Sequence, residues 1–223
     1  MGLDMYLYKA KRIGDATVDT VENIEKYFSW CLRPEKYRDS TPKDWSGCDY
    51  DALDLDLAKS YFDEYKVRYW SWDTEKKYPH HMISQMLIDW RKANHIHKWF
   101  VDNVCGGVDD CEPYEVEDYQ LEDLLAICKT IKANVNLVDG TVNNGYSYDA
   151  NTDDFIPLTA KGKVVDDPVL CDRLLPTKDG FFFGGTDYDE WYMDDIEYTI
   201  QMLEKVLKEI DWDNEMVWYE ASW

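Results

Sequence analysis

Apolar residues recur at helical spacing in several long segments, and this periodicity is the feature that most limits what the chain can fold into. Residues 117–135 show it most clearly, with an apolar residue about every 3.6 positions. Residues 18–32 and 187–210 repeat the pattern. Each apolar face must be buried against another element. We therefore predict an amphipathic helix in each of these three segments.

Two further helices are predicted in the first half of the chain. Residues 49–65 place their apolar side chains on one face and leave a run of aspartates on the other. Residues 83–104 place Leu87, Trp90, Asn94, His97 and Val101 on a shared face, because these positions follow the helical spacing.

Short extended segments lie between and around these helices. Residues 3–12, 66–72, 112–116, 181–183 and 216–223 are aromatic, β-branched or alternating, which is typical of strands. Residues 136–168 are rich in Asn, Asp, Gly and Thr and indicate a long loop or an irregular hairpin. The order shows no regular βαβ repeat. We predict an α+β fold, a small mixed or antiparallel sheet with several amphipathic helices packed on it, in a single domain over residues 1–223.

The net charge of the chain limits the classes of partner that it can bind. Its 46 acidic and 24 basic residues give a net charge of −22 and a pI of about 4.4. Such a surface repels phosphate backbones and anionic membranes, so we expect no direct nucleic-acid binding and no membrane binding. It favours a protein partner with a basic surface. A well-solvated acidic surface without a partner is the simpler alternative, and self-association into a homo-oligomer stays open.

One predicted helix face is acidic enough to imitate DNA. A DNA mimic needs many carboxylates along one surface, since duplex DNA carries one charge per about 1.7 Å. The predicted partner-binding face consists of Asp49, Asp51, Asp54, Asp56 and Asp63. Further carboxylates would come from Asp109 and Asp110, or from Asp194 and Asp195.

Several common sites and signals are missing from the sequence. None of the six cysteines forms a CxxC pair, so we expect no structural zinc, no other metal and no cofactor. The first residues do not form a signal peptide, and no stretch has the length of a membrane span. We expect a cytoplasmic protein with reduced thiols.

Two segments carry polar residues that could form a pocket. Asn94 and His97 interrupt the apolar face predicted for residues 83–104, and Arg91 flanks it. A buried amide or imidazole needs partners, so these residues either anchor the helix or line a pocket. The second segment, GFFFGGTDYDEWY at residues 180–192, is predicted as a buried strand, a glycine turn and a helix start with a capping box from Asp187 to Glu190.

Motifs spread along the chain resemble a family of uncharacterised phage and prophage proteins. They are MGLDMYLY at the start, WRKANHIHKWFV at residues 90–101, C-x-x-Y-x-V from Cys111, LLP followed by GFFFG and YDEWY, and a closing Y-x-x-SW. This chain has Asp89 where the family has Tyr before WRKAN, and about residues 14–85 stand as an acidic, aromatic insertion.

The resemblance implies a phage or mobile-element context and supplies no reaction. It also implies that the two polar segments meet, which would form a ligand-binding pocket from Arg91, Asn94, His97, Tyr188, Asp189 and Glu190.

Three classes of function are consistent with these observations. The first, which we favour, is a phage or mobile-element accessory protein in the host cytoplasm. It would bind and inhibit a host protein, such as a nucleic-acid-targeting defence factor, through a DNA-like acidic surface. The second is a protein that binds or sequesters a small molecule or nucleotide in the predicted pocket. The third, ranked last, is an enzyme with His97 as acid or base and Asp189 or Glu190 as its partner.

Overall fold

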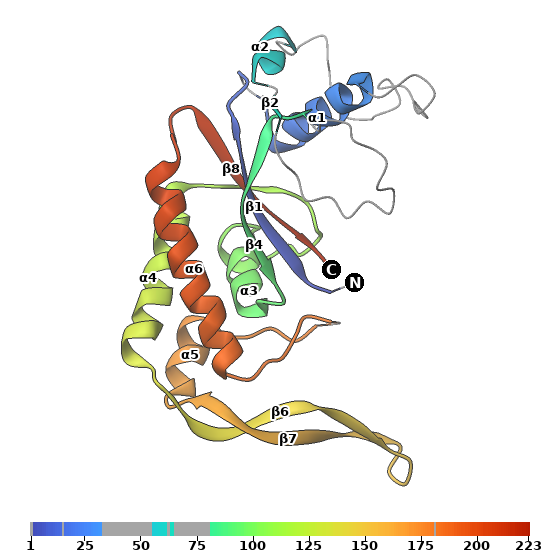
Figure 1. The fold of residues 1–223 in the computed structure, drawn as a ribbon, viewed down its shortest axis with the longest axis vertical. Coiled ribbons are helices and arrows are strands. Elements are labelled where there is room, and N and C mark those ends of the chain that lie inside the picture. Colours follow the sequence, from blue (N-terminus) through green and yellow to red (C-terminus); the bar gives the residue numbers. More distant parts are fainter. Residues whose placement is uncertain (1, 15, 33–54, 62, 65–80, 181) are drawn as a thin grey trace. The chain divides into compact units, whose positions relative to one another are not determined.

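The computed structural model describes residues 2–14, 16–32, 55–61, 63–64, 81–180 and 182–223. It shows an α+β protein, as the sequence predicts (Figure 1). A four-stranded sheet has the strand order β4-β1-β8-β5. Its strands are β1 (Asp4–Lys11), β4 (Ser84–Arg91), β5 (Tyr114–Val116) and β8 (Glu215–Ser222).

The helices are α1 (Val18–Leu32), α2 (Leu55–Ser60), α3 (Asn94–Asn103), α4 (Asp118–Asn134), α5 (Pro168–Leu174) and α6 (Glu190–Glu209). The shortest strands, β2 (Asp63–Glu64) and β3 (His81–Met82), pair antiparallel with each other. A third sheet contains only β6 (Leu137–Asp149) and β7 (Asp154–Val165), also antiparallel.

The chain forms two compact units, where the sequence analysis predicted one domain. Unit 1 comprises Met1–Tyr6, Ile88–Ile210 and Tyr219–Trp223, and unit 2 comprises Leu7–Leu87 and Asp211–Trp218. Strands β1, β4 and β8 each contribute residues to both units. The insertion predicted at about residues 14–85 falls inside unit 2.

Unit 2 has its own apolar core. Val18, Val21 and Ile24 of α1 are buried together with Met216 and Trp218 of β8. Helix α1 begins and ends where the sequence predicts. Near the strand ends the Lys9 ammonium lies 3.0 Å from the Glu215 carboxylate, which lowers the desolvation cost of that buried acid.

Unit 1 packs three helices around part of the sheet. The apolar faces of α4 and α6 were correctly predicted: Leu121, Leu124, Cys128 and Ile131 of α4 are buried, as are Tyr192, Ile196, Thr199, Leu203 and Val206 of α6. Figure 1 shows these two helices side by side. Helix α3 stacks Phe100 on Tyr219 of β8, with ring centroids 4.0 Å apart.

The predicted helix over residues 83–104 is wrong in its first half. Residues 84–91 form strand β4, in which buried Ile88 and Trp90 alternate with exposed Asp89 and Arg91. This two-residue period is that of a strand with one covered face. Lys92, with a φ of 61°, then turns the chain into α3.

Residues 136–168 form an antiparallel hairpin with one irregularity, which is one of the two alternatives that the sequence indicates. The ribbon, defined here as β6, β7 and their turn, carries one irregularity between Asn143 and Tyr146. Gly140 and Gly162 face each other across it. A Cβ at Gly140 would lie 2.4 Å from Val164 Cγ2, and one at Gly162 would lie 2.8 Å from Val142 Cγ2. Each glycine therefore leaves room for a valine side chain of the opposite strand to lie over it, in a strongly twisted pair.

Three further predictions concern residues 66–72 and 181–190. The strand predicted at residues 181–183 is wrong in its described part, because Phe182 has a φ of 63° and is exposed, although Phe183 is buried. The capping box from Asp187 to Glu190 is also wrong, because Asp189 caps α6 and Glu190 is its first residue. The strand predicted at residues 66–72 lies outside the described residues.

We expect Gly162→Ala to loosen the ribbon without unfolding the helices, because the added methyl group overlaps the Val142 side chain. Amide hydrogen exchange in residues 137–165 should accelerate about tenfold. Thr141→Ala, an exposed position on the neighbouring strand, is the matched control. Equal exchange in the two variants would contradict this packing.

Candidate functional site

Helix α3 is buried on nearly all sides, including its polar residues. Asn94, His95 and His97 are each at most 2% exposed. The turn before the helix fixes their direction, since the Lys92 N–H donates to the Leu3 carbonyl at 2.8 Å. Buried polar side chains need partners. Those of Asn94 and His97 define the candidate site.

Asn94 holds the segment between α5 and α6. Its Nδ2 donates to the carbonyls of Gly185 at 2.7 Å and Phe183 at 3.3 Å, and its Oδ1 accepts from the Lys178 N–H at 3.0 Å. The approach is close, because a Cβ at Gly184 would lie 3.0 Å from the Lys92 carbonyl oxygen and Gly184 has a φ of 100°. One amide therefore fixes both ends of residues 178–185 (the clamped loop).

His97 lies at the centre of a second network. Its Nδ1 is 2.8 Å from the Tyr219 hydroxyl and its Nε2 is 3.2 Å from the Asp109 carboxylate. Asp109 also accepts from Lys178 Nζ at 2.5 Å and from Trp223 Nε1 at 3.0 Å. The network ties α3, the clamped loop and the end of β8 together.

The protonation states follow from burial and partners. Burial lowers the pKa of His97, and the neighbouring Asp109 only partly opposes this. Burial alone would raise the pKa of Asp109, but hydrogen bonds from Lys178, His97 and Trp223 outweigh it and lower that pKa. At neutral pH we therefore assign a neutral His97, which donates from Nε2 to the Asp109 carboxylate and accepts at Nδ1 from Tyr219.

This geometry favours an anchoring role for His97. A histidine with a carboxylate partner can act as a general base, but it needs a free nitrogen that faces a substrate. Both nitrogens of His97 are engaged and the side chain is 1% exposed. The thiol of nearby Cys105 is no ready nucleophile, since burial raises its pKa to about 12.

The second predicted segment has different partners. The Tyr188 hydroxyl donates to Asp172 Oδ1 at 2.9 Å and accepts from the Thr177 N–H at 3.4 Å. Asp189 Oδ1 accepts from the Trp191 and Tyr192 N–H groups, which caps α6. Glu190 is exposed on the first turn of that helix.

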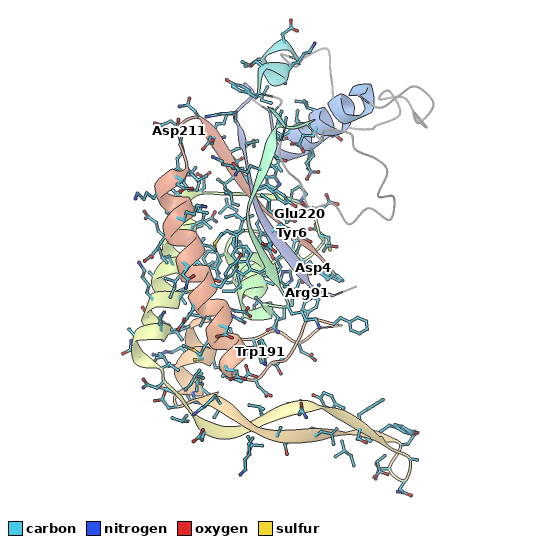
Figure 2. All side chains as sticks on the ribbon, viewed as in Figure 1. Asp4, Tyr6, Arg91, Trp191, Asp211 and Glu220 are labelled. Atoms are coloured by element: carbon cyan, nitrogen blue, oxygen red, sulfur yellow. The ribbon has the colours of Figure 1, made fainter. Side chains whose placement is uncertain are left out.

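Arg91 lies apart from the other predicted pocket residues. Because Trp90 points into the core, the next residue of the strand points to the opposite face. Arg91 is exposed there, and its Nε lies 3.8 Å from Asp4 Oδ1 (Figure 2). Its placement with Asn94 and His97 depended on a helix that does not extend this far.

The structure thus joins only part of the predicted pocket. Asn94 accepts a hydrogen bond from the Lys178 backbone N–H, and His97 is linked to the Lys178 ammonium through Asp109, which binds both. Tyr188 accepts a hydrogen bond from the backbone N–H of Thr177, the residue before Lys178. The two halves are therefore connected through the backbone at residues 177–178.

Sequence reasoning missed a pair of a buried histidine and a half-buried aspartate on the other side of α3. Among the described residues His95 Nε2 has no hydrogen-bond partner, and it lies 4.0 Å from Asp195 Oδ2. Burial lowers the pKa of His95 to about 3, and burial with the charges of Asp194 and Asp189 raises the pKa of Asp195 to about 7. The only sequence signal for Asp195 is its position, one helical turn after Trp191 and directly before Ile196, which belongs to the buried face of α6.

The predicted DNA-like face is described only at its end. Asp49, Asp51 and Asp54 lie outside the described residues, Asp56 is exposed on α2, and Asp63 belongs to β2. Only six residues of the predicted helix over 49–65 are described as helical.

The two further aspartate pairs contribute less than expected. Asp109 and Asp195 are partly buried against the histidines, so Asp110 and Asp194 alone are exposed. A denser run of exposed acids follows in sequence, from the loop before β5 to the start of α4. The acidic segment, as we name it, consists of the exposed residues Asp110, Glu112, Glu115, Glu117, Asp118, Glu122 and Asp123.

Neither a metal site nor a membrane span is found in the described part of the chain. Within it, no three His, Cys, Asp or Glu side chains gather as metal ligands would. None of its helices combines the length and apolarity that a membrane crossing requires. Comparison with protein-family models, curated proteins and solved structures finds no match.

We expect Asn94→Ala to reduce the free energy of unfolding by about 2–4 kcal/mol, because it leaves one N–H and two carbonyls of the clamped loop without their partner. Urea denaturation followed by tryptophan fluorescence measures this. Asn103→Ala, on the exposed end of the same helix, should cost about 1 kcal/mol or less. Equal losses in the two variants would argue against the clamp.

The pH dependence of stability should reveal Asp195. Its pKa in the folded chain exceeds that of an unfolded aspartate, so the folded state binds more protons between about pH 4 and pH 7, and stability falls as pH rises through this window. His95, with its lowered pKa, has the opposite effect between about pH 3 and pH 6.5.

We therefore expect Asp195→Asn to become more stable relative to the unmodified chain as pH rises from 5 to 8. The gain should be about 1–2 kcal/mol, below the full conversion of the pKa shift, because about a third of the side chain is exposed. Urea denaturation at several pH values measures it. Glu209→Gln, on the exposed last turn of α6, should show no such trend.

Proposed function

We propose that the chain is a phage or mobile-element accessory protein that binds and inhibits a host protein with a basic surface. The partner class is a nucleic-acid-binding protein, such as a defence factor, whose basic surface would accept carboxylates in place of phosphates. The resemblance of the sequence motifs supports the phage context, and the charge of the chain supports the class of partner.

The acidic segment is the observation that carries this proposal. Its seven exposed carboxylates lie along residues 110–123, from the loop before β5 to the start of α4, and residues 99–128 contain no Lys or Arg. Negative charge is also favourable in the first turn of a helix, so α4 accommodates Asp118 at little cost. A basic partner would find a one-sign surface here.

The small-molecule alternative has less support. The polar groups proposed for that pocket already have hydrogen-bond partners within the protein. Asn94 binds the clamped loop, both ring nitrogens of His97 are hydrogen-bonded, and Asp189 caps a helix. Binding there would have to displace contacts that hold unit 1 together.

The test is affinity capture from bacterial lysate at about 50 mM and about 200 mM salt. The unmodified chain is compared with a variant in which Glu112, Glu115, Asp118 and Glu122 become Gln or Asn. We expect the chain to enrich a nucleic-acid-binding protein at low salt. The variant should lose at least tenfold of this capture, because the attraction is electrostatic and screened by salt.

A matched control replaces four exposed acids elsewhere in unit 1, namely Asp139, Asp166, Asp179 and Glu209. This variant has the same net charge and should retain capture. Equal loss in both variants would mean that only total charge matters. Capture of no nucleic-acid-binding protein by the unmodified chain would overturn the proposed function.

A further inference from the structure

The far half of the ribbon exposes a set of aromatic side chains that the packing of unit 1 does not use. Tyr146, Tyr148 and Phe155 are 62%, 55% and 65% exposed. The ribbon extends from the helices of unit 1, and within the described residues it is a sheet of two strands (Figure 1). Exposed apolar groups of this size on a soluble protein mark interaction surfaces.

The register gathers these rings on one face. Tyr148 pairs with Phe155 and Tyr146 with Pro157. Directly opposed residues share a face, as do residues two apart along a strand. The two rings of the Tyr148–Phe155 pair lie 5.5 Å apart. Three rings and one proline therefore form a continuous platform, while Ile156 and Leu158 lie on the reverse face.

The irregularity in β6 produces this arrangement. Asn144 and Gly145 are inserted opposite Leu158, with a φ of 99° at Gly145. The bulge changes the alternation of β6 by one residue relative to its first half. Without it, Tyr146 and Tyr148 would lie on the face opposite to Phe155.

One carboxylate lies at the edge of the platform, and two more lie at the end of the ribbon. Asp149 and Asp154 form the last pair of the ribbon, and by alternation they lie on the reverse face with Ile156. Asp153 lies in the turn. The Tyr148 hydroxyl donates to Asp153 Oδ1 at 2.6 Å, so one of these carboxylates is fixed at the ring edge. The basic residues of the ribbon, Lys161 and Lys163, lie in its other half, where Lys163 pairs with Asp139 at 2.7 Å.

We propose that this platform, with the Asp153 carboxylate at its edge, binds an arginine-bearing segment of the basic partner protein. A guanidinium stacks on an aromatic face and pairs with a carboxylate at the same time, which matches both components of the site. This inference rests on the proposed function and assigns a surface that contacts the partner.

Charge excludes the other occupants of an aromatic surface. Bases of single-stranded nucleic acid also stack on such rings, but their phosphates would meet Asp153 at the ring edge, on a chain of net charge −22. A second copy of the chain would bring the same carboxylate and the same net charge. An arginine-bearing segment alone is attracted by both the rings and the Asp153 carboxylate.

The binding test uses a fluorescein-labelled peptide of six arginines alternating with glycines. Its lysine counterpart and an oligothymidylate serve as comparison probes. Fluorescence anisotropy at about 150 mM salt gives the affinity of each. The unmodified chain should prefer arginine to lysine. The double variant Tyr148→Ser with Phe155→Ser should bind the arginine peptide about tenfold more weakly and lose the preference, although its charge is unchanged.

Two control variants separate the rings from other effects. Phe155→Tyr keeps both rings and the Tyr148 hydroxyl, and should bind within about twofold of the unmodified chain. Tyr119→Ser removes a similarly exposed ring from α4 and should have no effect. Hydrogen exchange in residues 137–165 identifies any variant whose ribbon has opened, and Tyr146→Ser then serves as the milder replacement.

The outcomes distinguish this inference from the proposed function. Equal arginine-peptide binding by the serine double variant, by Tyr146→Ser and by the unmodified chain overturns the platform, whether or not a partner is captured from lysate. Tighter binding of the oligothymidylate, or sedimentation of the chain as a dimer that the serine double variant abolishes, also overturns it. Arginine preference at the platform without a captured nucleic-acid-binding protein leaves the platform standing and removes the proposed function.

Discussion

The candidate site in unit 1 depends on the hydrogen bonds of the Asn94 side-chain amide. This amide makes the hydrogen bonds that a neighbouring strand would otherwise make, because it donates to two carbonyls and accepts from one N–H of the clamped loop. Loop backbone buried without such partners would be costly. Only a side chain with both a donor and an acceptor at one end can do this, so neither Asp nor Leu could replace it.

The position of Asn94 is set by the strand before it. Trp90 closes the core by donating from its indole to Thr199 of α6 at 3.0 Å, and Lys92 turns the chain two residues later. His97 then follows Asn94 by three residues, close to one helical turn, and reaches Asp109 and Tyr219. The anchoring network is therefore a consequence of where β4 stops and α3 starts.

Sequence patterns could predict the elements that bury one clear face. The apolar residues of α4 and α6 recur at helical spacing, and β8 and β1 are short, aromatic and terminal, so fold class and most elements followed. The period of residues 83–91 was misjudged because Leu87, Trp90 and Asn94 also fit a helix. Only the burial of Ile88 and Trp90 against exposed neighbours shows the two-residue period.

The candidate site was only partly accessible to the same reasoning. Asn94 and His97 stand out as polar residues among apolar ones, which is a local signal. Their partners Asp109, Lys178 and Tyr219 come from three distant segments that no spacing rule connects. The sequence left a loop and a hairpin open for the ribbon, because its many Asn, Asp and Gly residues are typical of loops, whereas its strands are held by cross-strand pairing. The phage family and the proposed partner stay predictions.

The attachment of the ribbon to α6 has a mechanical consequence. Asp189 caps α6 and also forms a bridge with Val164 of β7, while the neighbouring Val165 N–H donates to the Tyr188 carbonyl at 3.0 Å. Strand and helix thus share one residue as a common joint. A load on the ribbon is transmitted through this joint to the first turn of α6. Trp191, 71% exposed and two residues beyond the joint, is a fluorophore at the point where that load arrives (Figure 2).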